Sequence, residues 1–410
     1  MSDSPAEQRG EAPRAKVVLI GGPDVDARLP LVHRLAPEFD VTVFGASSML
    51  AETFAQHGVS FRAYPLDRRL APFSDVRTVR ALTKLLRELR PDLVHAFDTK
   101  PGVFGCIAAQ RAGVPSSVCT VTGLGSLYSA GGIKTALLRR VYEWLQRAAS
   151  RRAARTVFQN HDDLRQLVAA GVVAPERATV ILGSGVDTAH FAPARVAPGR
   201  RQELRAELGL PVDAVVVTMI ARVTRTKGVL EFADAARAVR ATRAGVRFLL
   251  VGPDDEGSRD RLRPEELQQL RQAVTWPGAR ADIVDVLAAT DVFVLPTAYR
   301  EGIPRVLLEA ASMGLPMVTT DSPGCNEAVA AGENGLLIGS ADPAALAMAV
   351  ARLCDDPALR GRFGAASRRR AESLFDLGRV AERTRALYCE LLAGHASSSR
   401  RSPVQNSASR

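Results

Sequence analysis

The chain has 410 residues, of which 46% are apolar and 24% charged, and its net charge is +10. This length exceeds what one hydrophobic core usually supports, so two domains of somewhat under about 200 residues each are expected. The five cysteines are odd in number and show no Cys-x-x-Cys spacing, which argues against a disulfide framework or a zinc site. The positive charge indicates an anionic partner, and an aromatic content of only 5% disfavours nucleic acid as that partner.

The N-terminal segment is polar and lacks the apolar stretch of a signal peptide, and no run of about 18 apolar residues follows it. We therefore expect a cytoplasmic protein without a membrane span. Residues 1–15 are expected to be disordered, as is the Ser/Arg-rich tail at 395–410.

The first half of the chain alternates apolar runs with helical patterns. These runs lie at 16–21, 41–44, 92–97, 117–123, 156–160 and 179–183. Continuous apolar strands separated by helices predict a parallel sheet covered on both faces. Residues 16–192 are therefore predicted to form a Rossmann-like domain.

The same pattern restarts after a Pro-rich stretch, which is interpreted as a linker at 193–212. Apolar runs at 214–222, 247–252, 291–296, 316–321 and 335–338 predict a second domain over 213–374. A helix at 375–394 is expected to return to the first domain. Two doubly wound domains bind ligands at the carboxyl ends of their strands, in a cleft that both sheets face.

Two motifs at strand ends suit a phosphate. Gly21 and Gly22 end the first strand, where glycine lets backbone N–H groups approach a phosphate closely. After the first strand of the second domain, Arg222 and Lys227 lie five residues apart around a turn that opens a helix. Such cations stabilise a departing diphosphate. The alternative is a pair of ordinary surface cations, although lysine is scarce here, and Lys227 is one of five in the chain.

The stretch YREGIPRVLLEA at 299–310 places Glu301 and Glu309 eight residues apart, directly after an apolar strand. Pro304 suits a first helical turn, so Glu309 is expected inside a helix. Each carboxylate can accept two hydrogen bonds from neighbouring hydroxyls. Backbone N–H groups that can face phosphate or sugar oxygens between them are those of Gly302, Ile303 and Arg305. The alternative is a solvated loop glutamate and a helix-surface glutamate.

EGIPRVLLEA resembles the E-x7-E element of retaining GT-B glycosyltransferases of family 4, and RVTRTKG resembles the phosphate-binding turn of that family. The resemblance covers about residues 16–392. It includes TDSPGCNEAVAAGENGLLI at 320–338 and GSGVDTAHFAP at 183–193. Two segments of the first domain are similar to those of one branch of the family, namely RPDLVHAFDTKPGVFG and TVTGLGSLYS. Members of this branch extend polyisoprenyl-diphosphate-linked saccharides for capsule, O-antigen or N-glycan precursors.

The resemblance implies a retaining glycosyltransferase with the GT-B fold, and it implies a role for each motif residue. Glu301 holds hydroxyls of the donor sugar, Glu309 holds the ribose, and Gly302, Ile303, Pro304 and Arg305 complete the donor site. Arg222 and Lys227 hold the diphosphate, and Gly22 holds the phosphate from the facing domain. Arg222, Lys227 and Glu301 are the expected catalytic residues. The expected base is uracil, contacted near 278–282.

No cofactor is implied, and a metal ion is not expected, because no Asp-x-Asp motif lies at a suitable strand end. Many members of the family carry a histidine after the fourth strand of the first domain, where this chain reads VTGLG. No role can be carried over for it, and His95 is interpreted as a packed strand residue. No side chain is identified as a nucleophile. The resemblance implies departure and attack on the same face of the sugar, with the diphosphate itself accepting the proton.

The acceptor side is predicted from a basic helix and a strand-end lysine. The helix at 133–155 has a net charge of +6 beside an apolar stripe, whose members are Leu137, Val141, Trp144, Leu145 and Ala148. This stripe either lies on an anionic leaflet, at the inner face of the plasma membrane, or faces the core. Lys100 is hypothesised to contact the acceptor phosphate, with Tyr128 and Ser129 at the same mouth.

Two other functions remain open from the sequence. One is a nucleotide-sugar epimerase or a glycogen-type synthase on the same fold, and the other is a basic nucleic-acid binder. Neither would need the lipid-linked acceptor or the membrane-facing helix.

Overall fold

The structure is a computed structural model that describes residues 13–67, 71–129, 131–258 and 260–399. Of the two segments that are expected to be disordered, residues 1–12 and 400–410 lie outside the described residues. The portion of the tail at 395–399 continues the last helix, α16 (Leu377–Ser399).

The first sheet has seven strands, in the order β3-β2-β1-β4-β5-β6-β7. They are β1 (Ala15–Ile20), β2 (Phe39–Gly45), β3 (Ser60–Ala63), β4 (Leu93–Phe97), β5 (Ser116–Val121), β6 (Arg155–Phe158) and β7 (Ala178–Val180). β1 pairs in parallel with β2 and β4, as predicted. Six of the strands match the predicted apolar runs, whereas β3 was missed because this strand at the sheet edge is mostly exposed and has no apolar run.

Seven α-helices connect these strands: α1 (Leu29–Leu35), α2 (Ala51–Gln56), α3 (Pro72–Leu89), α4 (Thr99–Ala112), α5 (Ser126–Ser129), α6 (Ile133–Ser150) and α7 (His161–Ala169). α3 begins with Pro72, whose missing N–H costs nothing in the first turn. α4 ends at Gly113, which has a φ of 77° and closes the helix in the left-handed region.

The second sheet has six strands, in the order β10-β9-β8-β11-β12-β13. They are β8 (Val215–Ile220), β9 (Val246–Val251), β10 (Thr275–Gly278), β11 (Val292–Leu295), β12 (Met317–Thr320) and β13 (Gly335–Ile338). β10 was missed because its sequence, TWPG, contains the two residues that usually interrupt strands. The strand order reverses between β8 and β11, and ligands of open α/β sheets bind at such a switch point.

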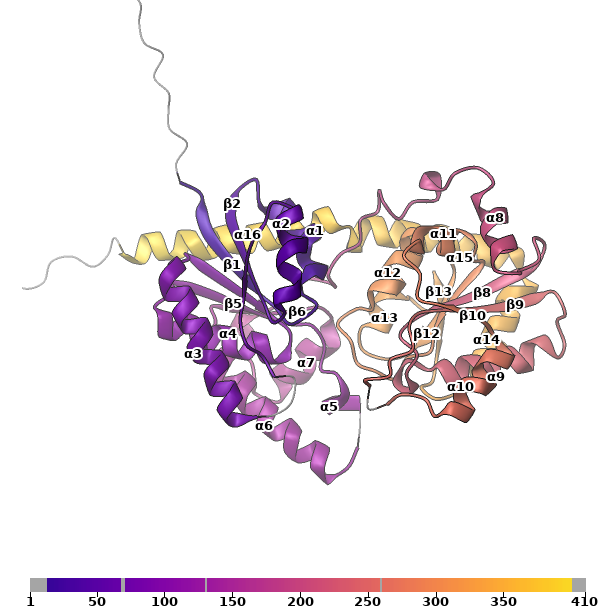
Figure 1. Ribbon diagram of the computed structural model, residues 1–410, viewed down its shortest axis with the longest axis horizontal. Helices are drawn as coiled ribbons and strands as arrows, with labels where there is room; N and C mark the ends of the chain where they lie inside the picture. Colours follow the sequence, from indigo (N-terminus) through magenta and orange to yellow (C-terminus); the bar gives the residue numbers. More distant parts are fainter. Residues whose placement is uncertain (1–12, 68–70, 130, 259, 400–410) are drawn as a thin grey trace, which may run out of the picture. The chain divides into compact units, whose positions relative to one another are not determined.

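The helices of this second half are α8 (Arg200–Glu207), α9 (Val229–Arg240), α10 (Pro264–Ala273), α11 (Ile283–Ala288), α12 (Arg305–Ser312), α13 (Cys325–Ala328), α14 (Pro343–Asp355), α15 (Pro357–Arg370) and α16. α9, α10 and α14 lie on one side of the six-stranded sheet, and α12 and α15 lie on the other (Figure 1). Both faces are therefore covered, as the continuous apolar strands predict.

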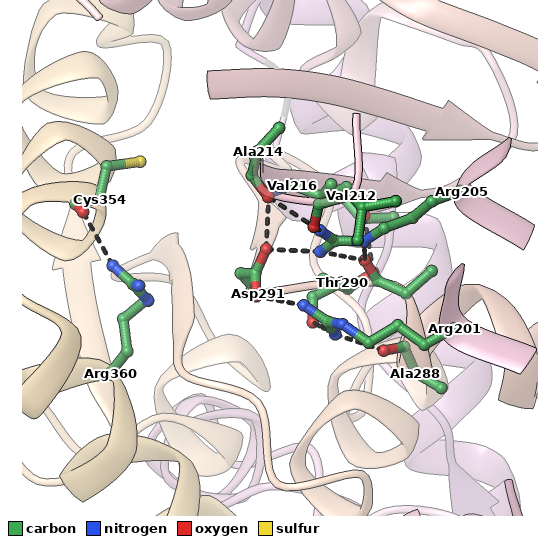
Figure 2. Close-up of polar contacts among 12 residues, drawn as sticks. Arg201, Arg205, Val212, Ala214, Val216, Ala288, Thr290, Asp291, Cys354 and Arg360 are labelled. Carbon is green, nitrogen blue, oxygen red and sulfur yellow. Dashed lines mark hydrogen bonds and ion pairs between the residues drawn. The ribbon is translucent and has the colours of Figure 1, made fainter. Parts of the chain in front are cut away.

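The stretch interpreted as a linker, 193–212, contains α8, which is anchored by a buried arginine (Figure 2). Arg205 is 1% exposed and donates hydrogen bonds to the backbone carbonyls of Val212, Ala214 and Ala289. It also pairs with the Asp291 carboxylate at 2.7 Å. The guanidinium thus satisfies backbone groups at the start of β8 and just before β11, which fixes the two central strands relative to α8.

Contacts divide the chain into two compact units, and the first consists of residues 1–119, 152–154 and 385–410. Within it, the Tyr388 hydroxyl of α16 lies 2.6 Å from Nδ1 of His95, and the Tyr388 ring packs edge-on against Phe39. His95 is 2% exposed, so the interpretation of His95 as a packed strand residue is confirmed. Burial, with a smaller contribution from Arg28, lowers the pKa of His95 to about 3.

Candidate functional site

The second unit comprises residues 120–151 and 155–384, and it contains the turn after β8. A short 3-10 helix at Arg225–Lys227 leads into α9 through Gly228, whose φ is 80°. A Cβ on Gly228 would lie 2.1 Å from the carbonyl oxygen of Pro296, so only glycine fits. This close approach brings the turn after β8, with Arg222 and Lys227, against the end of β11.

Lys227 and Glu301 form an ion pair, which joins the end of β8 to the loop after β11. Their side chains are only 15% and 25% exposed, respectively. The two loops are also joined by backbone, because the N–H of Ala298 donates to the carbonyl of Thr226 at 2.9 Å. The structure thus brings together two residues that the sequence placed in separate motifs. A cation beside a carboxylate at a switch point can bind a phosphate and a hydroxyl next to each other.

Arg222 points to the same end of the sheet but is 62% exposed, and it pairs with Asp255. Asp255 follows β9 and is not among the site residues predicted from the sequence. No group of three His, Cys, Asp or Glu side chains that could hold a metal ion occurs within the described residues.

Glu309 lies inside α12, as predicted, and its side chain is only 12% exposed. Burial raises the pKa of Glu309, and electrostatic interactions with Arg305 and His190 oppose that shift. Nη2 of Arg305 is 3.7 Å from the carboxylate, which is beyond hydrogen-bond reach. The alternative of an exposed helix-surface glutamate is therefore wrong. Pro304 lies at the N-cap, directly before the first residue of α12.

Residues 299–302, named here the Glu301 loop, are held by backbone contacts that the sequence did not reveal. The N–H of Gly125 donates to the Arg300 carbonyl at 2.9 Å, and the Arg300 N–H donates to Oγ of Ser129 at 3.1 Å. Nδ2 of Asn160 donates to the Gly302 carbonyl at 3.0 Å. A Cβ on Gly123 would lie 2.6 Å from the Glu301 carbonyl carbon, so the segment before α5 lies directly on the loop.

Ile303, which follows the loop, is 4% exposed and belongs to the core of the second unit. Gly302 has no room for a side chain, because a Cβ there would lie 2.1 Å from Oε1 of Gln159. These two residues of the predicted site therefore fix the backbone at the start of α12. Asn160 could have been found from sequence, since Asn-x-x-Asp before a helix is a capping pattern, and its side chain does accept from the Asp163 N–H.

In the first unit, the N–H of Gly22 donates to Oδ2 of Asp98 at 3.3 Å. Gly21 cannot carry a side chain, because a Cβ would lie 2.5 Å from Val25. Lys100, in the first turn of α4, pairs with Asp75 at 2.6 Å and donates to the Asp67 carbonyl at 2.9 Å. These are the intramolecular contacts of Gly22 and Lys100, and their predicted roles in binding phosphates stay predictions.

Tyr128, which was grouped with Lys100 from sequence, lies in the second unit. Its hydroxyl donates to Oε1 of Glu143 at 2.7 Å, and its ring is 4.7 Å from Arg139 and 5.6 Å from Arg300. Burial and the Glu143 carboxylate raise the pKa of Tyr128. Tyr128 therefore contacts both α6 and the Glu301 loop.

α6 buries a different face from the apolar stripe. Its buried side chains include Tyr142, Gln146 and Ala149, whereas Leu137 and Trp144 are 65% and 64% exposed. Exposed apolar residues on this helix are Ile133, Leu137, Leu138, Val141 and Trp144. Three of the five stripe residues are exposed, namely Leu137, Val141 and Trp144. The alternative that the stripe faces the core is therefore wrong for these three. Among the described helices, none is long and apolar enough to span a membrane.

Two family models match the chain. One, described as glycosyl transferases group 1, matches residues 214–356, and the other, described as a glycosyl transferase 4-like domain, matches residues 21–183. The first includes the turn after β8 and the Glu301 loop, and the second includes Gly22, Lys100 and α6.

Among curated relatives, the UDP-Gal:alpha-D-GlcNAc-diphosphoundecaprenol alpha-1,3-galactosyltransferase of Escherichia coli is 30% identical over 325 residues, which cover 78% of this chain and 82% of that protein. The N,N'-diacetylbacillosaminyl-diphospho-undecaprenol alpha-1,3-N-acetylgalactosaminyltransferase of Campylobacter jejuni is 30% identical, covering 81% of this chain and 87% of that protein. The structure of Anabaena HepE in complex with UDP and glucose, 23% identical, matches with a TM-score of 0.76 over 92% of this chain and all of that chain, a likeness of fold alone. The chain therefore belongs to glycosyltransferase family 4, has the GT-B fold and is a glycosyltransferase.

Proposed function

We propose that this glycosyltransferase moves a hexose or N-acetylhexosamine from a nucleotide-diphosphate sugar to a saccharide linked to polyisoprenyl diphosphate, for a surface polysaccharide or a related glycan. The observation that carries the donor half is the ion pair of Lys227 and Glu301 at the switch point of the six-stranded sheet. The acceptor half is supported by the names of the E. coli and C. jejuni relatives, both of which act on diphosphoundecaprenol-linked sugars.

The donor roles follow from charge and position. Lys227 and Arg222 neutralise the leaving diphosphate, and the N-terminus of α12, with the backbone of Gly302, Ile303 and Arg305, faces its oxygens. Glu301 accepts hydrogen bonds from the transferred sugar. Glu309 accepts them from the ribose of the nucleotide, for which uridine is the expected nucleoside.

The transfer is proposed to retain the anomeric configuration without a covalent enzyme intermediate. The bond between the anomeric carbon and the diphosphate oxygen breaks, and the acceptor hydroxyl oxygen bonds to that carbon on the same face. The acceptor proton passes to the leaving diphosphate. Arg222 and Lys227 supply the positive charge that this departure requires, so no metal ion or other cofactor is expected.

The first test is a thermal-shift screen of nucleoside diphosphates and nucleotide sugars. A true donor at 100 times its Kd should stabilise the protein by about 2.7 kcal/mol. The Lys227→Met variant should lose this shift because the ammonium no longer contacts the diphosphate. No shift with any compound at millimolar concentration would overturn the donor assignment.

The second test is transfer to a synthetic sugar linked to polyprenyl diphosphate, with the donor found in the screen. We expect a product whose new linkage has the configuration of the donor, measured by NMR, and a rate that EDTA does not change. Transfer only to free oligosaccharides would instead support a glycogen-type synthase, and conversion of the donor without transfer would support an epimerase.

We also propose that α6 docks on an anionic membrane, where the lipid-linked acceptor is found. The exposed Leu137 and Trp144 lie on α6, which ends at Ser150 and so holds only four of the seven basic residues of the predicted helix at 133–155. These four cations, Lys134, Arg139, Arg140 and Arg147, match anionic head groups. Flotation with anionic vesicles should recover the wild type. Each apolar side chain that leaves water contributes about 1.5–3 kcal/mol, so the double variant Leu137→Ser/Trp144→Ser should partition at least roughly 100-fold less.

Met348 of α14 provides the matched control, because it is 69% exposed and lies outside the basic helix. Met348→Ser should float like the wild type. Equal flotation of the double variant and the wild type would contradict docking through α6. Sharp salt-dependent binding to DNA at physiological ionic strength would revive the nucleic-acid alternative.

A further inference from the structure

We propose that Arg300 is a positioning residue that holds the Glu301 carboxylate in place and ties the Glu301 loop to α6. This proposal rests on the proposed function, in which Glu301 binds the transferred sugar. Arg300 directly precedes Glu301, so a shift of its backbone moves the next carboxylate as well.

The guanidinium of Arg300 is bound on the side of α7. Nη2 donates to Oδ1 of Asp163 at 2.8 Å, and the Asp163 side chain is 0% exposed. Asp163 is itself fixed, because its carboxylate accepts from Nδ2 of Asn160 at 3.0 Å. Asn160 in turn donates to the carbonyl of Gly302, on the other side of Glu301. The residues before and after Glu301 are therefore anchored to the same buried cluster.

This cluster is costly to build, which indicates that it serves more than stability. Burial raises the pKa of Asp163, and Asn160 and Arg300 offset the shift only in part. The Nε atom of Arg300 is buried and has no hydrogen-bond partner among the described residues. A buried donor without a partner costs about 1–3 kcal/mol. Buried polar groups without a partner are rare in native proteins, and a role in a functional site is one explanation for them.

On its other side, Arg300 reaches α6 through Tyr128. The guanidinium carbon lies 5.6 Å from the centre of the Tyr128 ring, and the Tyr128 hydroxyl donates to Glu143 of α6 at 2.7 Å. Two contacts thus connect the residue before Glu301 to the helix whose exposed apolar face is proposed to meet the membrane. The position of the sugar-binding carboxylate depends on the helix that the acceptor's membrane would contact.

The first test measures the loop without any ligand. Hydrogen exchange of the amides at 299–302 should be slow in the wild type and faster in Arg300→Ala. Arg300→Lys, which keeps a charge but lacks the planar guanidinium that both donates to Asp163 and lies over the Tyr128 ring, should be intermediate. Arg165→Ala is the matched control, since Arg165 lies on α7 near Asp163 and is 71% exposed. Equal exchange in all four proteins would overturn the proposal, whatever the donor is.

The second test separates positioning from stability. Displacing a sugar-binding group by about 1 Å can cost roughly 100-fold in rate, so Arg300→Ala should lower kcat by this order. Its affinity for the nucleoside diphosphate, which lacks the sugar, should change less than twofold. If the affinities for the nucleoside diphosphate and the nucleotide sugar fall equally, Arg300 has only a structural role.

A double-mutant cycle shows whether Arg300 acts through Glu301. Arg300→Ala should lower kcat in the wild-type background and have little further effect in Glu301→Ala. If the decreases in kcat of the two single variants multiply in the double variant, the two residues act independently and the proposal is overturned. Absence of any nucleotide-sugar binding by the wild type would refute the proposed function instead, whereas the hydrogen-exchange result would still decide the anchoring role of Arg300.

Discussion

Replacement of Glu309 by glutamine should strengthen the fold and weaken nucleotide binding. The Glu309 side chain is 12% exposed, and its pKa is raised because burial penalises the charged form. A carboxyl whose pKa is higher in the folded than in the unfolded protein contributes stability below its unfolded pKa, and this contribution is lost as the pH rises through the folded pKa. At neutral pH the native protein therefore carries a desolvation cost that glutamine lacks.

The functional loss is larger than this gain. A hydrogen bond to a charged group contributes about 1.5–3 kcal/mol, and a carboxylate can accept one from each ribose hydroxyl. Glutamine keeps one oxygen but loses the charge and one acceptor. We expect affinity for the nucleoside diphosphate to fall by about 2–3 kcal/mol, which is roughly 30- to 150-fold. In the wild type, affinity should fall as the pH drops through the raised pKa of Glu309.

Calorimetric titration and thermal unfolding between pH 5 and pH 8 measure both effects on the same samples. Glu203→Gln is the control, because the Glu203 side chain is 66% exposed. The Tm of Glu309→Gln should exceed that of the wild type at pH 8, and the difference should shrink toward pH 5. Unchanged nucleotide affinity would remove Glu309 from the ribose site, and a lower Tm at pH 8 would refute the argument from burial.

Three further substitutions test individual contacts. Asp255→Asn should release the exposed Arg222 from its ion pair and tighten nucleoside diphosphate binding by up to about fivefold in a titration, since such a surface pair contributes about 0.2–1 kcal/mol. Weaker binding would contradict the idea that Asp255 competes with the diphosphate for Arg222. Arg205→Met should lower the free energy of unfolding, measured in urea, by about 3–5 kcal/mol, because it removes a buried ion pair and leaves carbonyls unsatisfied. A decrease below about 1 kcal/mol would show that these groups find other partners. Gly123→Ala should lower transfer activity by displacing the Glu301 loop, while Gly131→Ala, with open space at its Cβ, should not.

The sequence was sufficient to predict the features that depend on residues close together in the chain. Buried parallel strands are continuous apolar runs, so eleven of the thirteen strands in the described residues could be located, and the charged turns were assigned to the ends of β8 and β11. The strand order then places these ends next to each other. The two strands that were missed, β3 and β10, contain no continuous apolar run.

The sequence could not predict which distant segments fasten the Glu301 loop. Asn160 and Asp163 lie about 140 positions before the Glu301 loop. Nothing in their local sequence pattern indicates that Asn160 donates to the Glu301 carbonyl or that Asp163 accepts from Arg300. The outward face of α6 was unpredictable for a related reason. An apolar stripe reveals that one face avoids water, but only the packing of Tyr142, Gln146 and Ala149 shows that the stripe is not the buried face.

The two cations of the proposed donor site are not equivalent, and the difference follows from what each contacts. Arg222 pairs with Asp255 at an exposed position, where an incoming diphosphate can compete at little cost. Lys227 is mostly buried beside Glu301. An ammonium has three N–H donors, so Lys227 can bind the Glu301 carboxylate and a phosphate oxygen together. If Glu301 holds the sugar, one lysine then fixes that sugar next to the bond that breaks. A guanidinium is planar and broader, so arginine would not reproduce this geometry, although it is by far the commoner cation in the chain.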